Sequence, residues 1–423
     1  MRKLYFILIT VISFVTLSCT SKDKCADVIC PIGSICVDGT CITNTTNVIV
    51  NTNITVNTLW TRDKIYELSG RITVTDGATL AIEAGTIIKG QTGTGANASA
   101  LLIARGAKII AIGTPDLPII FTSVADEISI QDITNKNFSS PNLSPTMQGL
   151  WGGLIILGRA PISASANEIQ IEGIPTTDAN GLYGGNNPYD ASGILNYISI
   201  RHGGANIGNG NEINGLTLGG VGSGTIIENI EIIGNQDDGI EFFGGNASVK
   251  NAIIWNSGDD AIDTDQAWSG TLDNVIIICG DATDHALEID GAEGTYTAYN
   301  HIINVSVKGN ASSELADFRA CAMGSFENIY FFNFHDPAAT SGRGDFSLTN
   351  PSSSTCTVDN FRNNLLEFNN LQVTLPSGVL LSNVFLNGTD IKAVNVLSRS
   401  TGANKSVFEG WSWAYQNGSL IEF

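Results

Sequence analysis

The stretch that decides the fold runs from residue 225 to residue 291, as TIIENIEIIGNQDDGIEFFGG (225–245), SVKNAIIWNSGDDAIDTDQAWSG (248–270) and TLDNVIIICGDATDHALEIDG (271–291). These three lines superimpose. Asn229, Asn251 and Asn274 begin the same kind of apolar strand, at separations of 22 and 23 residues. A repeat of this length is one coil of a parallel β-solenoid, whose strands stack about 4.8 Å apart. The sequence therefore predicts an all-β fold of stacked parallel coils.

The asparagines that head these strands resemble the internal ladder of right-handed parallel β-helices, in which side-chain amides bond to the amides above and below. The same Asn-aliphatic signature recurs at Asn196, Asn328 and Asn383. We interpret these residues as structural. The fold class that the resemblance implies is a right-handed parallel β-helix.

Segments before and after the repeats set the expected boundaries. GRITVTDGATLAIEAGTIIKG (70–90) and ALLIARGAKIIAIGTPDLPIIFTS (100–123) alternate apolar and polar residues between glycine corners, as strands with one inward face do. We expect a linker and N-terminal cap at 44–64, the β-helix at 65–400, and loop insertions near 124–148 and 163–191. FEGWSWAYQNG (408–418) predicts a C-terminal cap over 401–423 that covers the end of the solenoid.

The first residues predict export. Two basic residues precede a short apolar run that ends in small residues, so residues 1–18 are typical of a signal peptide. Thr16-Leu17-Ser18-Cys19 resembles the lipobox of bacterial lipoproteins, which implies that Cys19 is lipidated and that residues 19–24 form a tether. Because Thr20 and not Asp follows the cysteine, the resemblance also implies a location in the outer membrane, at the cell surface. A plain secreted protein is the alternative.

The cysteines agree with an oxidising compartment. Cys25, Cys30, Cys36 and Cys41 lie in a segment, 25–43, too small for a hydrophobic core, so we predict a small disulfide-rich module similar to an EGF-like fragment. Its disulfide connectivity stays open, and a zinc site is the rival interpretation. Later in the chain, Cys279 is expected to be a buried apolar residue. A bridge between Cys321 and Cys356 is possible.

Composition limits the partners. The chain has 46 Gly, 11 Pro and a formal net charge of −20, so nucleic acid is excluded as a partner. Between Asn251 and Val307 there are many acidic residues and no Lys or Arg, and we therefore expect no internal counter-charge there.

The aligned coils bring acidic residues into rows. Glu241, Asp263 and Glu288 should be in register and point outward, because Ile240, Ile262 and Leu287 beside them point inward. Further rows follow, so the predicted metal ligands are Asp237, Asp238, Glu241, Asp259, Asp260, Asp263, Asp265, Asp284, Glu288 and Asp290. Stacked carboxylates repel, and calcium, which accepts six to eight oxygen ligands, is the expected cation. The alternative is that the aspartates of the turns cap nearby amides.

The segments WGG, NGLTLGGVGSGT, DDGIEFFGG and GDDAIDTD resemble the pectin-lyase-like superfamily and, within it, surface lipoproteins of Gram-negative bacteria. QDDG (236–239) and SGDDAID (257–263) are similar to the Asp-Asp segment of polygalacturonase-type glycoside hydrolases. That likeness implies Asp259 or Asp260 as general acid, Asp238 as the residue that activates water, and His285 as the residue that tunes them. No Gly-His-Gly and no Arg-x-Lys segment accompanies them.

Two functional hypotheses follow. The favoured one is a calcium-stabilised, non-catalytic surface module that binds glycans or another envelope component. The alternative is a polysaccharide hydrolase or lyase that uses the Asp-Asp coils, in which case the carboxylates should lie in an open groove with aromatic and basic walls. His202, which ends a strand, is expected to bond to a neighbouring carbonyl.

Overall fold

The protein was analysed as a computed structural model that describes residues 24–25, 28, 34–37, 39–43, 47–206 and 213–423. It divides into two compact units, residues 1–46 and 47–423. In the first unit, β1 (Ser34–Val37) and β2 (Thr40–Thr43) form an antiparallel hairpin, in which Cys36 stands opposite Cys41. Cys25 is disulfide-bonded. The signal peptide, Cys19, Cys30 and the side chains of Cys36 and Cys41 lie outside the described part.

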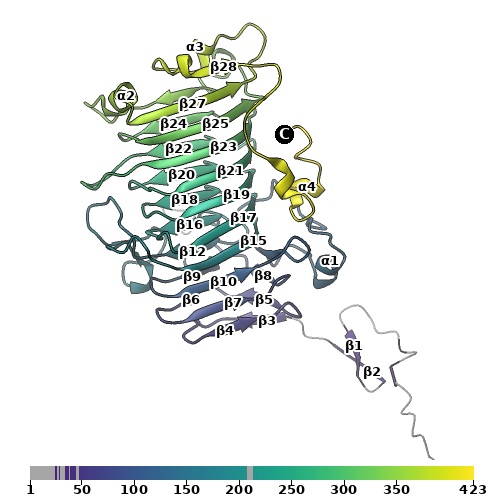
Figure 1. Ribbon diagram of the computed structural model, residues 1–423. Helices are drawn as coiled ribbons and strands as arrows, with labels where there is room; N and C mark the ends of the chain where they lie inside the picture. Colours follow the sequence, from purple (N-terminus) through teal and green to yellow (C-terminus); the bar gives the residue numbers. More distant parts are fainter. Residues whose placement is uncertain (1–23, 26–27, 29–33, 38, 44–46, 207–212) are drawn as a thin grey trace, which may run out of the picture. The chain divides into compact units, whose positions relative to one another are not determined.

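The second unit is a parallel β-helix, which confirms the predicted fold (Figure 1). Its larger sheet has 15 strands among the described residues, and the strand order follows the coils from one end to the other. In chain order its strands are β3 (Asn47–Val50), β4 (Thr58–Trp60), β5 (Ile65–Leu68), β7 (Thr79–Ile82), β8 (Ile87–Gly90), β10 (Lys108–Ile112), β11 (Ile119–Ser123), β15 (Gly193–Arg201), β17 (Ile226–Ile233), β19 (Ser248–Trp255), β21 (Thr271–Ile278), β23 (Asn300–Lys308), β25 (Gly324–Phe332), β27 (Leu366–Val373) and β28 (Ala393–Asn395).

The second sheet has nine described strands, and it closes the coils on the opposite side. Its strands are β6 (Arg71–Val74), β9 (Ala100–Ile103), β12 (Leu154–Leu157), β16 (Leu216–Gly219), β18 (Ile240–Phe243), β20 (Ile262–Asp265), β22 (Leu287–Asp290), β24 (Ala316–Arg319) and β26 (Phe346–Leu348). The first coil begins at Asn47, earlier than expected, because β3 already pairs with β5.

Apolar side chains of one register position fill the interior. Ile230, Ala252, Val275, Val305 and Ile329 stand on successive strands of the 15-stranded sheet, and each is fully buried. At each inward register position, similar apolar side chains stack from one coil to the next. Their burial supplies the main stabilising free energy of the fold.

The predicted asparagine ladder is confirmed at the bend of these strands. Asn251 donates to Asn229 over 3.0 Å, Asn274 donates to Asn251 over 2.8 Å, and Asn229 donates to Asn196 over 2.8 Å. The ladder asparagines of β17, β19 and β21 have φ of 55°, 59° and 64°, a left-handed conformation that Asn tolerates better than most residues. Each strand therefore turns a corner at its asparagine.

Two ladder members were missed and one prediction was wrong. Asn304 donates to Asp273, and Asn370 donates to Asn328, so both belong to the ladder although the spacing of the repeats is interrupted there. Asn383 does not belong to it. It lies in the short helix α3 (Leu381–Val384), where its side chain accepts a hydrogen bond from the backbone of Leu380.

The segments outside the coils contain short helices and a short hairpin. The first insertion contains α1 (Ile130–Thr134), and the second contains the hairpin β13 (Ile169–Gln170) and β14 (Leu182–Tyr183). The other helices are α2 (Cys356–Arg362), α4 (Trp413–Gln416), and the 3-10 turns at Gly95–Asn97, Ala179–Gly181, Pro337–Ala339, Thr389–Lys392 and Lys405–Phe408. Among the described residues, no helix has the length and apolar character needed to cross a membrane.

The segment expected to cover the end of the solenoid lies elsewhere. Phe408, Trp411, Trp413, Leu420 and Phe423 pack against the outward side chains of β17, β19 and β21. Figure 1 shows the yellow C-terminal segment running back beside these strands. The aromatic residues therefore cover an apolar side of the sheet, since Ile233, Ile253 and Ile276 would otherwise face water.

The two later cysteine predictions are confirmed. Cys321 and Cys356 form a disulfide that ties the turn after β24 to the start of α2. Cys279 is buried and unbridged, and burial raises the pKa of its thiol to about 12.

Candidate functional site

The predicted row of carboxylates is present on the nine-stranded sheet. Glu241 on β18 stands opposite Asp263 on β20, which stands opposite Glu288 on β22. Ile240, Ile262 and Leu287 precede them and are fully buried in the interior, so the acidic side chains point away from it. The row continues to Asp317 on β24, a member that the sequence analysis missed because its coil is longer.

The acids of the turns cap amides one coil further on. The carboxylate of Asp238 accepts a hydrogen bond of 2.8 Å from the backbone N–H of Asp260. Asp260 in turn accepts one of 2.7 Å from the backbone N–H of His285. One carboxylate oxygen of each aspartate therefore caps a backbone amide, as the alternative interpretation of these residues expects. The capped amide belongs to the next coil and not to the turn of the aspartate itself.

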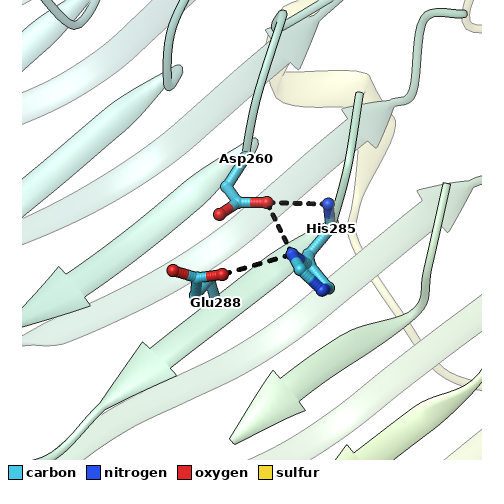
Figure 2. Close-up of side chains that lie close together, drawn as sticks. All are labelled: Asp260, His285 and Glu288. Atoms are coloured by element: carbon cyan, nitrogen blue, oxygen red, sulfur yellow. Dashed lines mark hydrogen bonds and ion pairs between the residues drawn. The ribbon is translucent and has the colours of Figure 1, made fainter. Parts of the chain in front are cut away.

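His285 is held among acidic side chains. Its Nδ1 lies 2.9 Å from Asp260 and 3.3 Å from Glu288, as Figure 2 shows, and its Nε2 lies 3.3 Å from Glu314. Burial alone would lower the pKa of the imidazole, but the hydrogen bonds and charges of Asp260 and Glu314 raise it to about 10. Both ring nitrogens are therefore donors, and a protonated ring has no lone pair for a metal ion.

Two arginines from later coils supply counter-charge, which corrects the expectation that this region has none. Arg319, at the end of β24, pairs with Glu288 and lies 2.6 Å from Asp290. Arg343, from the loop after β25, pairs with Asp284 and lies 3.0 Å from Glu314. The expectation was wrong because it considered charges within the acidic stretch alone. Successive coils of a solenoid are nearest neighbours, so Arg319 on the next coil stands directly opposite Asp290.

Three buried carboxylates lie close together without such a counter-charge. Asp238, Glu241 and Asp263 each offer an oxygen atom within 4.8 Å of the others, and they are only 6%, 6% and 7% exposed. We call them the carboxylate cluster. No Lys, Arg or His within the described chain forms an ion pair with them. Burial, followed by the charges of neighbouring carboxylates, raises the pKa of all three well above the ordinary value.

Within the part of the chain that the structure describes, two of the buried oxygens without a hydrogen-bond partner belong to the carboxylate cluster or to a residue bonded to it. One is Oδ1 of Asp263, and the other is Oδ1 of Asn214, a residue only 1% exposed. The amide nitrogen of Asn214 donates to Glu241 and, over 3.3 Å, to Thr217. Buried polar atoms normally have partners. Hard cations bind oxygen ligands, and oxygens that accept no hydrogen bond have lone pairs available for such a cation.

The second insertion covers apolar side chains of the nine-stranded sheet. Ile162, Ile171, Ile174 and Tyr183 pack on the outward apolar side chains of the nine-stranded sheet, Phe243 among them. The Tyr183 hydroxyl donates to Gln266 over 3.0 Å. The insertion therefore forms a roof over this part of the sheet, which no repeat pattern could have predicted.

The other predicted metal ligands fall outside the cluster. Asp265 and Asp290 end β20 and β22, where burial raises their pKa values to about 6 and about 8. Asp237 and Asp259 lie near Asp238 at the turn, and Asp259 is exposed. The remaining three, Asp260, Asp284 and Glu288, contact His285 or an arginine.

A polar hollow of about 460 Å³ opens beside the turn acids. It is lined by Asp259, Asp281, Asp284, Thr340 and Arg343 among others, and none of its lining side chains is aromatic. Of the residues implied by the hydrolase likeness, only Asp259 reaches this hollow. Asp260 and Asp238 are 4% and 6% exposed, and His285 is 9% exposed.

Comparison with known proteins identifies the fold family of the chain and the general class of its function. A family model described as pectate-lyase-like beta helix domain matches residues 52–135 and 137–414, and it supports a glycan-related β-helix protein. Neither the curated proteins nor the solved structures contain a significant match. The matched residues make up most of the chain and include every strand of the carboxylate row. The chain belongs to the family of pectate-lyase-like β-helix domains.

Proposed function

We propose that this chain is a cell-envelope lipoprotein, attached to the outer membrane through Cys19, whose calcium-stabilised β-helix is a non-catalytic surface module for binding glycans. The family match supports the glycan class. The single observation that carries the non-catalytic part is the burial of two residues that the hydrolase likeness implies: Asp238 and Asp260 are only 6% and 4% exposed. A general acid or base must come within hydrogen-bond reach of the substrate, and side chains so enclosed do not meet a polysaccharide.

We place the calcium ion in the carboxylate cluster. Each of its three carboxylates offers one oxygen within 4.8 Å of the others, and the Oδ1 of Asn214, whose amide nitrogen bonds to Glu241, is a fourth candidate ligand, so water or further carboxylate oxygens would complete the six to eight ligands that calcium accepts. Without a cation, each ionised pair at 4.8 Å would repel by roughly 3 kcal/mol at an effective dielectric constant of 20. Because the predicted ligands next to His285 and the arginines already have counter-charge, we assign them a structural role and not a metal-binding one.

The calcium site is tested by thermal unfolding with and without a chelator. Calcium at one hundred times its dissociation constant should stabilise the fold by about 2.7 kcal/mol. Asp263→Asn should abolish this shift and make the calcium-free protein more stable than the wild type, because one repulsive charge is removed. The matched control is Asp281→Asn at an exposed turn, which should keep the calcium response. An unchanged unfolding midpoint after thorough chelation would refute the calcium site.

Glycan binding is tested separately. The mature protein, loaded with calcium, is applied to an array of neutral and acidic glycans, and binding is compared with that of the chelated protein. Reproducible binding to one glycan class supports the proposal. No binding to any glycan, by a protein shown to be folded, would contradict it.

One observation favours the glycan-cleaving alternative. The hollow beside the turn acids contains Asp259, Asp284 and Arg343, and therefore one basic side chain next to carboxylates. A reducing-sugar assay over the same glycans is the test. Release of sugar that is lost in Asp259→Asn, but kept in Asp116→Asn at an exposed residue outside the hollow, would establish the enzyme and overturn the non-catalytic proposal.

A further inference from the structure

A buried histidine at the end of β15 joins three parts of the chain. His202 follows β15 and is fully buried. Its Nδ1 lies 2.7 Å from the carbonyl oxygen of Met147, at the end of the first insertion. Its ring also meets the ring of Trp413 edge-on, with 5.8 Å between the centroids. The predicted bond from this histidine to a carbonyl is therefore confirmed, and it connects the sheet to two distant segments.

Trp413 belongs to a segment that we call the C-terminal strap, residues 403–423. Besides its apolar contacts with β17, β19 and β21, the strap makes directed hydrogen bonds to the sheet. The N–H of Ala414 donates to Glu231 over 2.9 Å, and the N–H of Ala403 donates to Ser306 over 2.9 Å. Gln416 accepts from the N–H of Phe138 and donates to the carbonyl of Lys136. The strap thus holds the first insertion against the sheet.

The protonation state of His202 follows from its contacts. A carbonyl oxygen only accepts, so Nδ1 carries the proton toward Met147. Nε2 is buried and has no hydrogen-bond partner among the described residues. A second proton on Nε2 would place a charged, unpaired donor in a site without water, next to the guanidinium of Arg201. His202 is therefore neutral when the strap is closed.

The charged groups around this ring do not neutralise the positive charge that a second proton would bring, because the nearby carboxylates already have partners of their own. Arg201, on the same strand, is fully buried and lies over the ring of Trp413, 4.9 Å from its centroid. Glu231 on β17 faces Arg201 across 4.0 Å. Asp126, in the first insertion, is bonded to Thr122 and Ser140.

The charged residues of the strap itself point elsewhere. Lys405 donates to the carbonyls of Leu420 and Ile421, Glu422 pairs with Lys308 on β23, and Glu409 is exposed. None of them offers His202 a negative partner.

We propose that His202 is an acid-sensitive latch: when its ring takes a second proton, the C-terminal strap and the end of the first insertion detach from the 15-stranded sheet. Opening lets water reach the ring, so the proton is accommodated in the open form alone. Release would free a 21-residue segment rich in aromatic residues while the coils beneath stay paired.

The direction of the pH effect follows from the two states. In the closed state, burial lowers the pKa of His202, as does Arg201, although the bond to Met147 and the charge of Asp126 act in the opposite sense. In the open state the pKa is near the ordinary value of about 6.5. The stability of the closed state is therefore complete above pH 6.5 and is lost as the pH falls below it. The opening constant should rise about tenfold from pH 7.5 to pH 5.5.

Glu231 acts in the opposite sense. Burial raises its pKa, so protonation of Glu231 in the closed state favours closure as the pH falls. The comparison of wild type with His202→Gln isolates the histidine, because both proteins contain Glu231. Gln retains an N–H that can donate to Met147, but it cannot take up a proton.

The test is hydrogen exchange of the mature protein at pH 7.5 and pH 5.5, with calcium present and rates corrected for intrinsic exchange. Peptides from 403–423 should open about tenfold more at pH 5.5 in the wild type, while peptides from β18, β20 and β22 should not change. His202→Gln should remove this pH response. His335→Gln, at an exposed histidine, should leave it as in the wild type.

Two outcomes would overturn the latch: strap peptides that open equally at both pH values in the wild type, or a pH response that persists in His202→Gln. If His202→Gln does not fold, Trp413→Ala provides the second test without a change at the histidine. It should open the strap at both pH values and abolish the pH response, because the ring is then in water throughout. A retained tenfold response in Trp413→Ala would equally refute the latch.

Discussion

Replacement of Asn251 by alanine tests the asparagine ladder at its centre. The substitution removes two side-chain hydrogen bonds, one of 3.0 Å to Asn229 and one of 2.8 Å from Asn274. At about 1 kcal/mol each, their loss costs about 2 kcal/mol. Alanine must also adopt the φ of 59° that the corner requires, which costs a further 1–2 kcal/mol or so. We therefore expect a loss of about 3–4 kcal/mol in the free energy of unfolding.

Asn251→Gly separates the two contributions. Glycine loses the same hydrogen bonds but accepts the left-handed conformation, at the cost of greater freedom in the unfolded chain. It should be about 1 kcal/mol more stable than Asn251→Ala. The measurement is urea unfolding followed by far-ultraviolet circular dichroism. Asn137→Ala, at an exposed position of the first insertion, is the control and should change stability by less than about 0.5 kcal/mol. Equal stability of the alanine and glycine variants, or a loss below 1 kcal/mol in both, would refute the reasoning.

Three further outcomes are expected. Replacement of Cys321 and Cys356 by serine opens a loop of 35 residues and should cost about 4 kcal/mol by the chain-entropy model, which urea unfolding will show; a loss below 1 kcal/mol would contradict it. Arg319→Met removes one of the two counter-charges of Glu288, the other being His285, and should cost about 1–2 kcal/mol at pH 8, whereas Arg362→Met at an exposed pair should cost almost nothing. In chelator, the unfolding midpoint should be higher at pH 5.5 than at pH 8. The carboxylate cluster has raised pKa values, so the folded state binds more protons and stability is lost as the pH rises from about 4; the opposite trend would show that the cluster is not the dominant titrating group.

The fold could be predicted because a solenoid repeats itself in the sequence. Asn229, Asn251 and Asn274 fixed the register of three coils, and that register placed Glu241 opposite Asp263 as the structure has it. A strand period of two then determined which side chains point inward. A longer loop before Asn304 lengthens its coil, so the regular interval between ladder asparagines is lost there and the sequence does not predict Asn304 as a member of the ladder.

The surroundings of the carboxylate row could not be predicted in this way. Arg319 and Arg343 reach the row from coils whose length varies, and the roof of the second insertion comes from a segment without a repeat. The aromatic residues of 408–418 predicted a cover, and they do cover apolar surface, but sequence alone does not say which surface. Contacts between a coil and a non-repeating segment depend on the path of that segment, which no periodic pattern records.

The return path of the C-terminal strap has a mechanical consequence. Hydrogen bonds between the coils run along the solenoid axis, so tension on the last coil would break them one coil at a time, starting from the C-terminal end. The strap connects the chain beyond β28 back to β17, β19 and β21 (Figure 1), so that the last coils cannot peel away without also tearing Trp411 and Trp413 from the sheet. Fraying from that end is thereby converted from a sequence of small steps into one larger cooperative event.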